Sequence, residues 1–321
     1  MTFPVNSGEI LFVKSVKDGI PNRDPLHESD ARRIFGEEDG RISLSDVSLK
    51  RDVRDYVLQR YPDGGEGKNR FIFVREERSD SGSLLGRGSL AQSIAEKAGY
   101  AEKNMESLLK KAAFDVRTFG IVFSVKKETF KFTGPVQFGW AHSLHPVETK
   151  YVQGTVVMPS EDVKISQEGK EEGKGQGTIW TAYTLPFALF AMPGVINASI
   201  AAQTGMNEED QELLLEALWK GTLLRQARGR GLQKPLFLLH VEYSDPFFRI
   251  GYLEDALRLL PEREEWLSGK APTSLTEVTL QVRGLAERLG KYQDRIARIR
   301  YWVDPEFQID GEIPGERQPL W

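Results

Sequence analysis

The 321-residue chain contains no cysteine, and this absence excludes disulfide frameworks, zinc fingers and thiol catalysis. Histidine is scarce too, and none of the four, His27, His142, His145 and His240, stands in the HExxH spacing of a zinc hydrolase. The most apolar run, Leu185 to Val195, contains two prolines and is too short to cross a bilayer. We therefore expect no metal site and no membrane segment.

The start of the chain, MTFPVNSGEILF, lacks both the basic and the apolar region of a signal peptide, and we expect a cytoplasmic protein. The net charge is −4 and the isoelectric point is 5.8, which argues against indiscriminate coating of nucleic acid. A local basic groove is still allowed, because the field that binds phosphate is screened within about 10 Å. Composition alone leaves the function open.

Periodicity predicts an α+β chain. After long insertions are set aside, the core order is βαββαβ, the split unit of ferredoxin-like and RNA-recognition-motif sheets. Such a sheet is a common platform for single-stranded RNA. Strands are expected over 9–16, 70–75, 114–125, 130–142, 151–158, 178–185, 236–243 and 277–282, and helices over 45–61, 89–99, 101–113, 185–204, 207–226, 253–260 and 284–299.

The most informative stretch is the helix predicted after Gly40. Ser45 is expected to cap its first amides through the side-chain oxygen, and Asp46 complements the helix dipole. At 3.6 residues per turn three groups separate: apolar Leu49, Val53, Tyr56 and Val57, basic Lys50, Arg51 and Arg54, and acidic Asp52 and Asp55 beyond them. A basic border beside an apolar face suits a phosphate backbone. The plainer interpretation is a solvated helix with one Arg51–Asp55 pair.

Two other stretches invite functional interpretations. Gly86 to Ala91 has the spacing of a dinucleotide fingerprint, but a polar loop precedes it where that motif needs a strand, so no cofactor is expected. Ser160 to Gly177 is too polar to form a core. It is either a surface loop or a hairpin arm, and the strand-like segments on both sides favour the arm.

Several segments together resemble the backbone subunit of type I CRISPR interference complexes, the seventh Cas family, particularly its type I-B branch. That family carries Thr-Asp-Val-x-Leu-Lys-Arg-x-Ile-Arg-Asp-Tyr, and Ser45 to Tyr56 reads SDVSLKRDVRDY. Its Asn-Pro-Asn-Gly-Asp-Pro loop is matched in part by IPNRDP at Ile20 to Pro25. Further matches follow in order at Phe114–Gly120, Gly134–Phe138, Leu185–Leu189, Glu216–Trp219 and Val241–Tyr243, so that the resemblance covers residues 9–260.

The resemblance implies a hand-shaped fold with an RNA-recognition-motif/ferredoxin-like palm, a helical finger insertion and a β-hairpin thumb. The chain would be a single elaborated domain, with the palm at 1–61, 113–156 and 179–245, the fingers at 62–112, the thumb at 157–178 and a C-terminal addition at 246–321. It also implies a homo-oligomeric filament along CRISPR guide RNA that presents the bases to a target DNA strand. The small, large and repeat-handle subunits of a Cascade complex would be further partners.

A subunit that accepts any guide should contact phosphates and sugars and leave base edges free. The resemblance therefore implies RNA-binding residues but no catalytic residue, with Met158 as an apolar wedge on the thumb. The expected RNA-binding residues are Asn22, Arg23, Ser45, Lys50, Arg51, Arg54, Gln137, His142, Met158, Arg228, Arg230 and Lys234.

Two alternatives remain. Backbone subunits of type III complexes resemble this family and cut RNA with a loop aspartate, and Asp24 lies in a comparable loop. Magnesium often uses one or two carboxylates plus substrate phosphates, so one aspartate would suffice; otherwise Asp24 orders its own turn. The second alternative is an RNA-recognition module that acts alone.

Overall fold

A nine-stranded sheet organises the structure, a computed structural model that describes residues 3–21, 40–102, 104–125, 128–155, 164–165, 171–172, 179–227, 229–267, 269 and 271–321. The strands β1 (Gly8–Gly19), β10 (Ile179–Ile196) and β11 (Leu232–Tyr243) form its centre, with β1 antiparallel to both neighbours. The full order is β16 (Glu316–Arg317), β14 (Ile296–Val303), β11, β1, β10, β6 (Ala141–Ser143) and β2 (Ser43–Leu44), while β5 (Val136–Phe138) and β7 (Lys150–Thr155) also pair with β10. The α+β expectation is confirmed.

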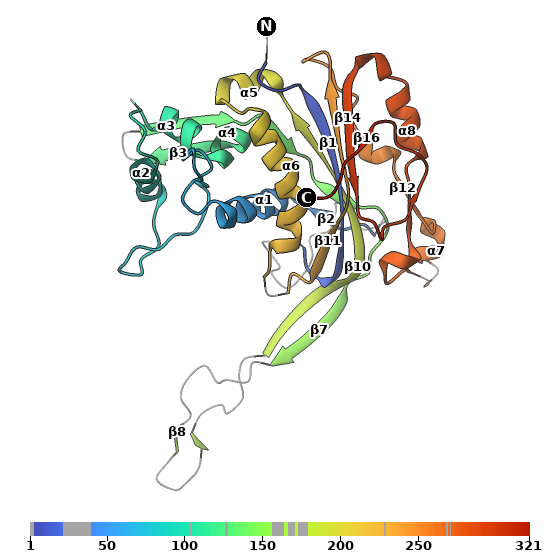
Figure 1. The fold of residues 1–321 in the computed structure, drawn as a ribbon. Coiled ribbons are helices and arrows are strands. Elements are labelled where there is room, and N and C mark those ends of the chain that lie inside the picture. Colours follow the sequence, from blue (N-terminus) through green and yellow to red (C-terminus); the bar gives the residue numbers. More distant parts are fainter. Residues whose placement is uncertain are drawn as a thin grey trace.

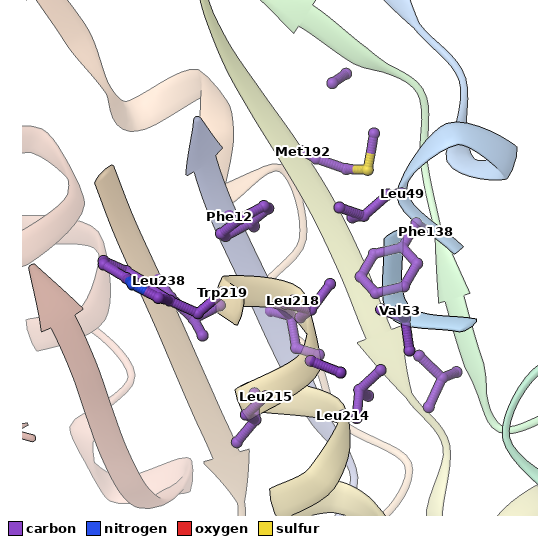
Figure 2. Close-up of a cluster of buried hydrophobic side chains, with 14 of the residues drawn as sticks. Phe12, Leu49, Val53, Phe138, Met192, Leu214, Leu215, Leu218, Trp219 and Leu238 are labelled. Carbon is purple, nitrogen blue, oxygen red and sulfur yellow. The ribbon is translucent and has the colours of Figure 1, made fainter. Parts of the chain in front are cut away.

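Two helices cover one face of this sheet (Figure 1). They are α1 (Asp46–Arg60) and α6 (Glu208–Leu224), and their apolar sides meet alternate residues of β1 such as Phe12 (Figure 2). Both helices begin where the sequence predicts. At Gly221 of α6 a Cβ atom would lie 2.3 Å from the carbonyl oxygen of Asp52, so only glycine permits this close approach to α1.

The other face of the sheet is covered by the C-terminal part of the chain. Leu11 and Val13 of β1 point into this second core. His145 stacks on Trp266 with ring centroids 3.5 Å apart in this second core. The elements here are η2 (Leu253–Ala256), β12 (Arg258–Leu260), α7 (Arg263–Leu267), η3 (Leu275–Glu277), β13 (Thr279–Gln281), α8 (Arg283–Gly290), η4 (Gln293–Arg295) and β15 (Ile309–Asp310). The C-terminal Trp321 returns to the first face, where it stacks on Trp302 at 4.9 Å beside Trp219 of α6.

A third core lies beside the sheet, to the left in Figure 1. It contains α2 (Arg87–Ala98), α3 (Met105–Ala112), α4 (Phe114–Phe119) and a separate antiparallel pair, β3 (Gly120–Val125) with β4 (Glu128–Thr133). The strand predicted over 114–125 is therefore wrong in its first half, where Gly120 at φ 88° ends a short helix. The strand predicted over 70–75 is also wrong, since only Phe71 forms a bridge, to Ala113.

A two-stranded arm projects from the sheet (Figure 1). Its stem is β7 paired with the first residues of β10, and β8 (Lys164–Ile165) pairs with β9 (Glu171–Glu172) farther along. The strand-like segments that flank the polar segment therefore pair with each other as expected, and of Ser160–Gly177 itself the structure describes only β8 and β9.

Three further element predictions are corrected by the structure. The helix expected over 185–204 is strand β10 up to Ile196, and only α5 (Ala198–Thr204) is helical. A strand buried on both faces is a continuous apolar run, which periodicity does not separate from a buried helix. The helix expected over 284–299 ends at Gly290 and gives way to β14, and the strand expected over 130–142 is divided among β4, β5 and β6. No helix in the described ranges is long and apolar enough to cross a membrane.

Candidate nucleic-acid interface

Arginine side chains gather in a pocket of about 420 Å³ between the amino-terminal half of α1 and the carboxyl end of α6. We call it the arginine pocket. Its lining residues are Arg51, Arg54, Arg225 and Arg230, with Ile20, Pro21, Ser45, Val47, Ser48, Val74 and Ala227. The helices bring these cations together although their sequence positions lie far apart.

Two of the arginines are held through Nε. The Nε of Arg51 lies 2.7 Å from Asp55, and the Nε of Arg54 donates to the buried carboxylate of Asp115 at 2.9 Å. The Arg51–Asp55 pair predicted from the sequence is thereby confirmed. Within the described residues, this arrangement leaves the terminal guanidinium nitrogens as donors for a ligand, and planar guanidinium groups suit phosphate oxygens.

A buried ion cluster around Asp52 lies beneath the pocket and includes two of its lining arginines, Arg225 and Arg230. The Asp52 carboxylate accepts hydrogen bonds from Lys14 at 3.1 Å, Arg225 at 2.9 Å and Arg230 at 2.9 Å. Burial alone would raise the pKa of Asp52, but the three cations outweigh it and hold that pKa below its usual value. Sequence reasoning placed Asp52 on the outer side of α1; the structure buries it completely.

For two cations of the cluster, Lys14 and Arg230, burial outweighs the attraction of the carboxylate and disfavours the charged form. Burial lowers the pKa of Lys14 to about 8, and burial also lowers the pKa of Arg230. Arg230 is 4% exposed, and its Nε has no hydrogen-bond partner among the described residues. A buried donor without a partner is costly, so an anion in the pocket would stabilise it.

The pocket carries an excess of positive charge. Among the described residues, four arginines line the pocket, Lys14 lies beneath them, and three carboxylates bind these five cations. The cations are Lys14, Arg51, Arg54, Arg225 and Arg230, and the carboxylates are Asp52, Asp55 and Asp115. The balance of about two positive charges suits phosphates of a nucleic-acid backbone.

Of the residues expected to bind RNA, Ser45, Arg51, Arg54 and Arg230 lie in the arginine pocket. The capping role expected of Ser45 is wrong. Ser45 stands at the N-cap position, but its side chain makes no capping hydrogen bond; the Ser48 amide donates instead to the Ser45 carbonyl oxygen at 3.2 Å.

Four other expected residues lie outside this pocket. Lys50 bonds Asp46 at 2.9 Å and the Gln137 side chain at 3.0 Å, at the border of α1. His142 lies in β6 between β2 and β10. Lys234 pairs with Asp304 and Glu306 on the far side of β11, and these bonds raise its pKa although burial acts against them.

The remaining expected positions lie outside the described residues. They are Asn22, Arg23, Met158 and Arg228, and Asp24 of the ribonuclease alternative also lies outside the described residues. In the described ranges, no group of three histidine, aspartate or glutamate side chains could hold a metal ion.

Sequence reasoning missed Lys14 and Arg225. The one sequence signal for Arg225 is Gly221, four residues earlier, which allows α6 to approach α1. Lys14 interrupts the apolar run of β1, and a lysine in the middle of a buried strand needs a partner.

Comparisons with known proteins extend over nearly the whole chain. The family model described as "CRISPR-associated protein Cas7" matches residues 6–283. A protein of Haloferax volcanii with the same description is 26% identical over 329 aligned residues, which cover 95% of this chain and 89% of that protein.

Two solved structures share the fold. A chain of a "CRISPR RNA-guided surveillance complex, pre-nicking" superposes with a TM-score of 0.59 at 16% identity, covering 98% of this chain and 96% of that one. A chain of a "CRISPR RNA-guided surveillance complex" gives 0.52 at 14% identity, covering 98% and 95%.

Proposed function

This chain belongs to the CRISPR-associated protein Cas7 family, and we propose that it is a non-catalytic backbone subunit that binds CRISPR guide RNA in an RNA-guided surveillance complex. The observation that carries the proposal is the arginine pocket, with its excess positive charge and its guanidinium donors. Guanidinium groups can bind backbone phosphates whatever the base sequence, as a subunit that accepts any guide requires.

We assign the palm to the central sheet with α1 and α6. The strand order β11–β1–β10–β6 with two helices on one face is that of a split βαββαβ unit and supports an RNA-recognition-type palm. The fingers would be 62–112, extended to residue 133 because β3 and β4 pack with α2 and α3. The thumb at 157–178 and the C-terminal addition at 246–321 complete the proposal.

We propose that phosphates bind Arg51, Arg54, Arg225 and Arg230. Asn22, Arg23 and Arg228 would bind the same strand, with Lys50, Ser45, Gln137, His142 and Lys234 along its path and Met158 as the wedge on the thumb. Copies of the chain would line the guide, present it to a target DNA strand and meet the other Cascade subunits in the cytoplasm. The near-complete motif at Ser45–Tyr56 supports the type I-B branch.

The first test is purification of the complex from its native operon, followed by sequencing and sizing of the bound RNA. A discrete repeat–spacer RNA with several copies of the chain is expected. A random RNA mixture, or none, would contradict the proposal. A protein that stays monomeric on a long RNA would instead favour the lone-module alternative.

The residue-level test uses Arg51→Gln with Arg54→Gln on RNAs of unrelated sequence. Loss of two phosphate contacts should weaken binding equally for all of them and reduce the slope of log K against log salt by about 1.4. Arg283→Ala with Arg298→Ala is the matched control, since both arginines lie in surface pairs of the C-terminal part. A change confined to one sequence would refute the phosphate interpretation.

The ribonuclease alternative has its own test. Incubation of target RNA with the assembled complex and magnesium should leave the RNA intact. Regular fragments that disappear in Asp24→Ala would overturn the non-catalytic proposal.

A further inference from the structure

We propose that Asp115 is a positioning residue that fixes Arg54 for guide binding; this inference rests on the proposed function. Asp115 lies in the first turn of α4 and its side chain is fully buried. Its carboxylate accepts from the Nε of Arg54 at 2.9 Å and from the backbone amides of Phe73 and Val74 at 2.8 and 3.0 Å.

One carboxylate therefore joins three parts of the chain. Arg54 belongs to α1, Asp115 to α4, and Val74 to the segment that precedes α2. Both Arg54 and Val74 line the arginine pocket, so the carboxylate of Asp115 holds two lining residues in place. A shift of α4 relative to α1 would move the cation and the apolar wall together.

A second contact fixes the plane of the guanidinium. The Cζ of Arg54 lies 5.2 Å from the centroid of the Phe119 ring, one helical turn after Asp115. With Nε bound to the carboxylate and the group beside an aromatic ring, the terminal nitrogens have a defined direction. A side chain ordered before binding loses less freedom when the phosphate arrives.

The charge of Asp115 and its orienting role predict opposite effects of its neutralisation on RNA binding, so an experiment can separate them. Asp115 is a negative charge beside a site for anions, so its neutralisation should tighten RNA binding if charge were its whole effect. If Asp115 acts by orienting Arg54, Asp115→Asn should weaken binding by about three- to tenfold, the cost of ordering one mobile side chain.

The experiment measures RNA affinity of the full-length protein at several salt concentrations, using an unstructured oligonucleotide. The variants are Asp115→Asn, Arg54→Gln and their combination. Asp210→Asn is the matched control, because Asp210 is another buried aspartate that holds an arginine, Arg117, at 2.6 Å, outside the pocket. Thermal melts compare the folded fraction of every variant.

The inference is supported if Asp115→Asn weakens binding, has no further effect in the Arg54→Gln background, and Asp210→Asn binds as the wild type does. It is overturned if Asp115→Asn binds equally or more tightly, or if it weakens the Arg54→Gln variant by the same factor. If Arg54→Gln itself binds normally, the phosphate contact of the proposed function fails and this inference fails with it.

Arg54→Lys gives an independent answer if Asp115→Asn does not fold. Lysine keeps the charge but is a single ammonium, which binds either the carboxylate or a phosphate and has no Nε to anchor it. We expect a loss of affinity similar to that of Arg54→Gln at unchanged net charge. Wild-type affinity in Arg54→Lys would show that orientation through Asp115 is dispensable.

Discussion

Replacing Asp52 with asparagine tests the ion cluster under the arginine pocket. The change leaves Lys14, Arg225 and Arg230 without their shared carboxylate in a site where Asp52 is fully buried. Removal of one member of a buried ion pair costs about 3–5 kcal/mol, because the partner charge stays buried and uncompensated. We expect a loss of unfolding free energy in this range.

The assay is urea unfolding followed by circular dichroism. Asp55→Asn is the control on the same helix: Asp55 pairs with Arg51 nearer the surface, and such pairs contribute at most about 1 kcal/mol. Adding Lys14→Met to Asp52→Asn should recover part of the loss, since it removes one of the uncompensated cations. A loss below about 1 kcal/mol in Asp52→Asn, or no recovery in the double variant, would refute the reasoning.

The pH dependence gives a second readout of the same cluster. Burial lowers the pKa of Lys14 to about 8, whereas its value in the unfolded chain is near 10.5. Between these values the unfolded chain binds more protons than the folded protein, so this group makes stability rise with pH, by about 3 kcal/mol over the whole window. Lys14→Met should abolish that rise, and an unchanged rise would show that Lys14 is not its source.

Three further perturbations concern the rest of the fold. Burial lowers the pKa of His145 to about 4, so below pH 6.5 the unfolded chain binds a proton at this residue that the folded protein does not bind. Stability should therefore fall as the pH is lowered from 6.5 to 4. His145→Gln should reduce this slope by about 1.4 kcal/mol per pH unit in urea titrations. Gly221→Ala should cost about 1–3 kcal/mol in the same assay despite alanine's higher helix propensity, because its Cβ would meet the Asp52 carbonyl oxygen; a gain in stability would contradict the close helix approach. Trp321→Ala removes the stack on Trp302 and should cost about 1 kcal/mol with a change in tryptophan fluorescence, and no change would show that the stack is absent in solution.

Local rules located the elements whose pattern is unambiguous. The apolar stripe of α1 and the start of α6 after Asn207 are both readable from neighbouring residues alone, and in the structure Asn207 and Asp210 form a capping box. The strand predicted over 236–243 is confirmed as part of β11, which lies inside the sheet between β1 and β14. An apolar run did not identify the whole of β10, because its first residues were predicted as a strand over 178–185 and the rest as part of a helix over 185–204.

The arginine pocket was predictable only where its residues belong to one helix. Arg51 and Arg54 stand on the basic border of one helix, so helical geometry alone groups them. Arg225, Lys14 and the burial of Asp52 depend on how α6 and β1 pack against α1, and no local pattern specifies that packing. Long-range contacts, rather than motif content, were the missing information.

The length of β10 has a mechanical consequence. The strand runs without a break from the arm stem at Ile179 through the interior of the sheet to Ile196, with β1 on one side and β5 and β6 on the other. A pull on this strand of the arm stem is therefore transmitted directly into the middle of the sheet. The load is shared by two hydrogen-bond ladders instead of opening one bond at a time, because the arm is joined to an interior strand and not to an edge strand.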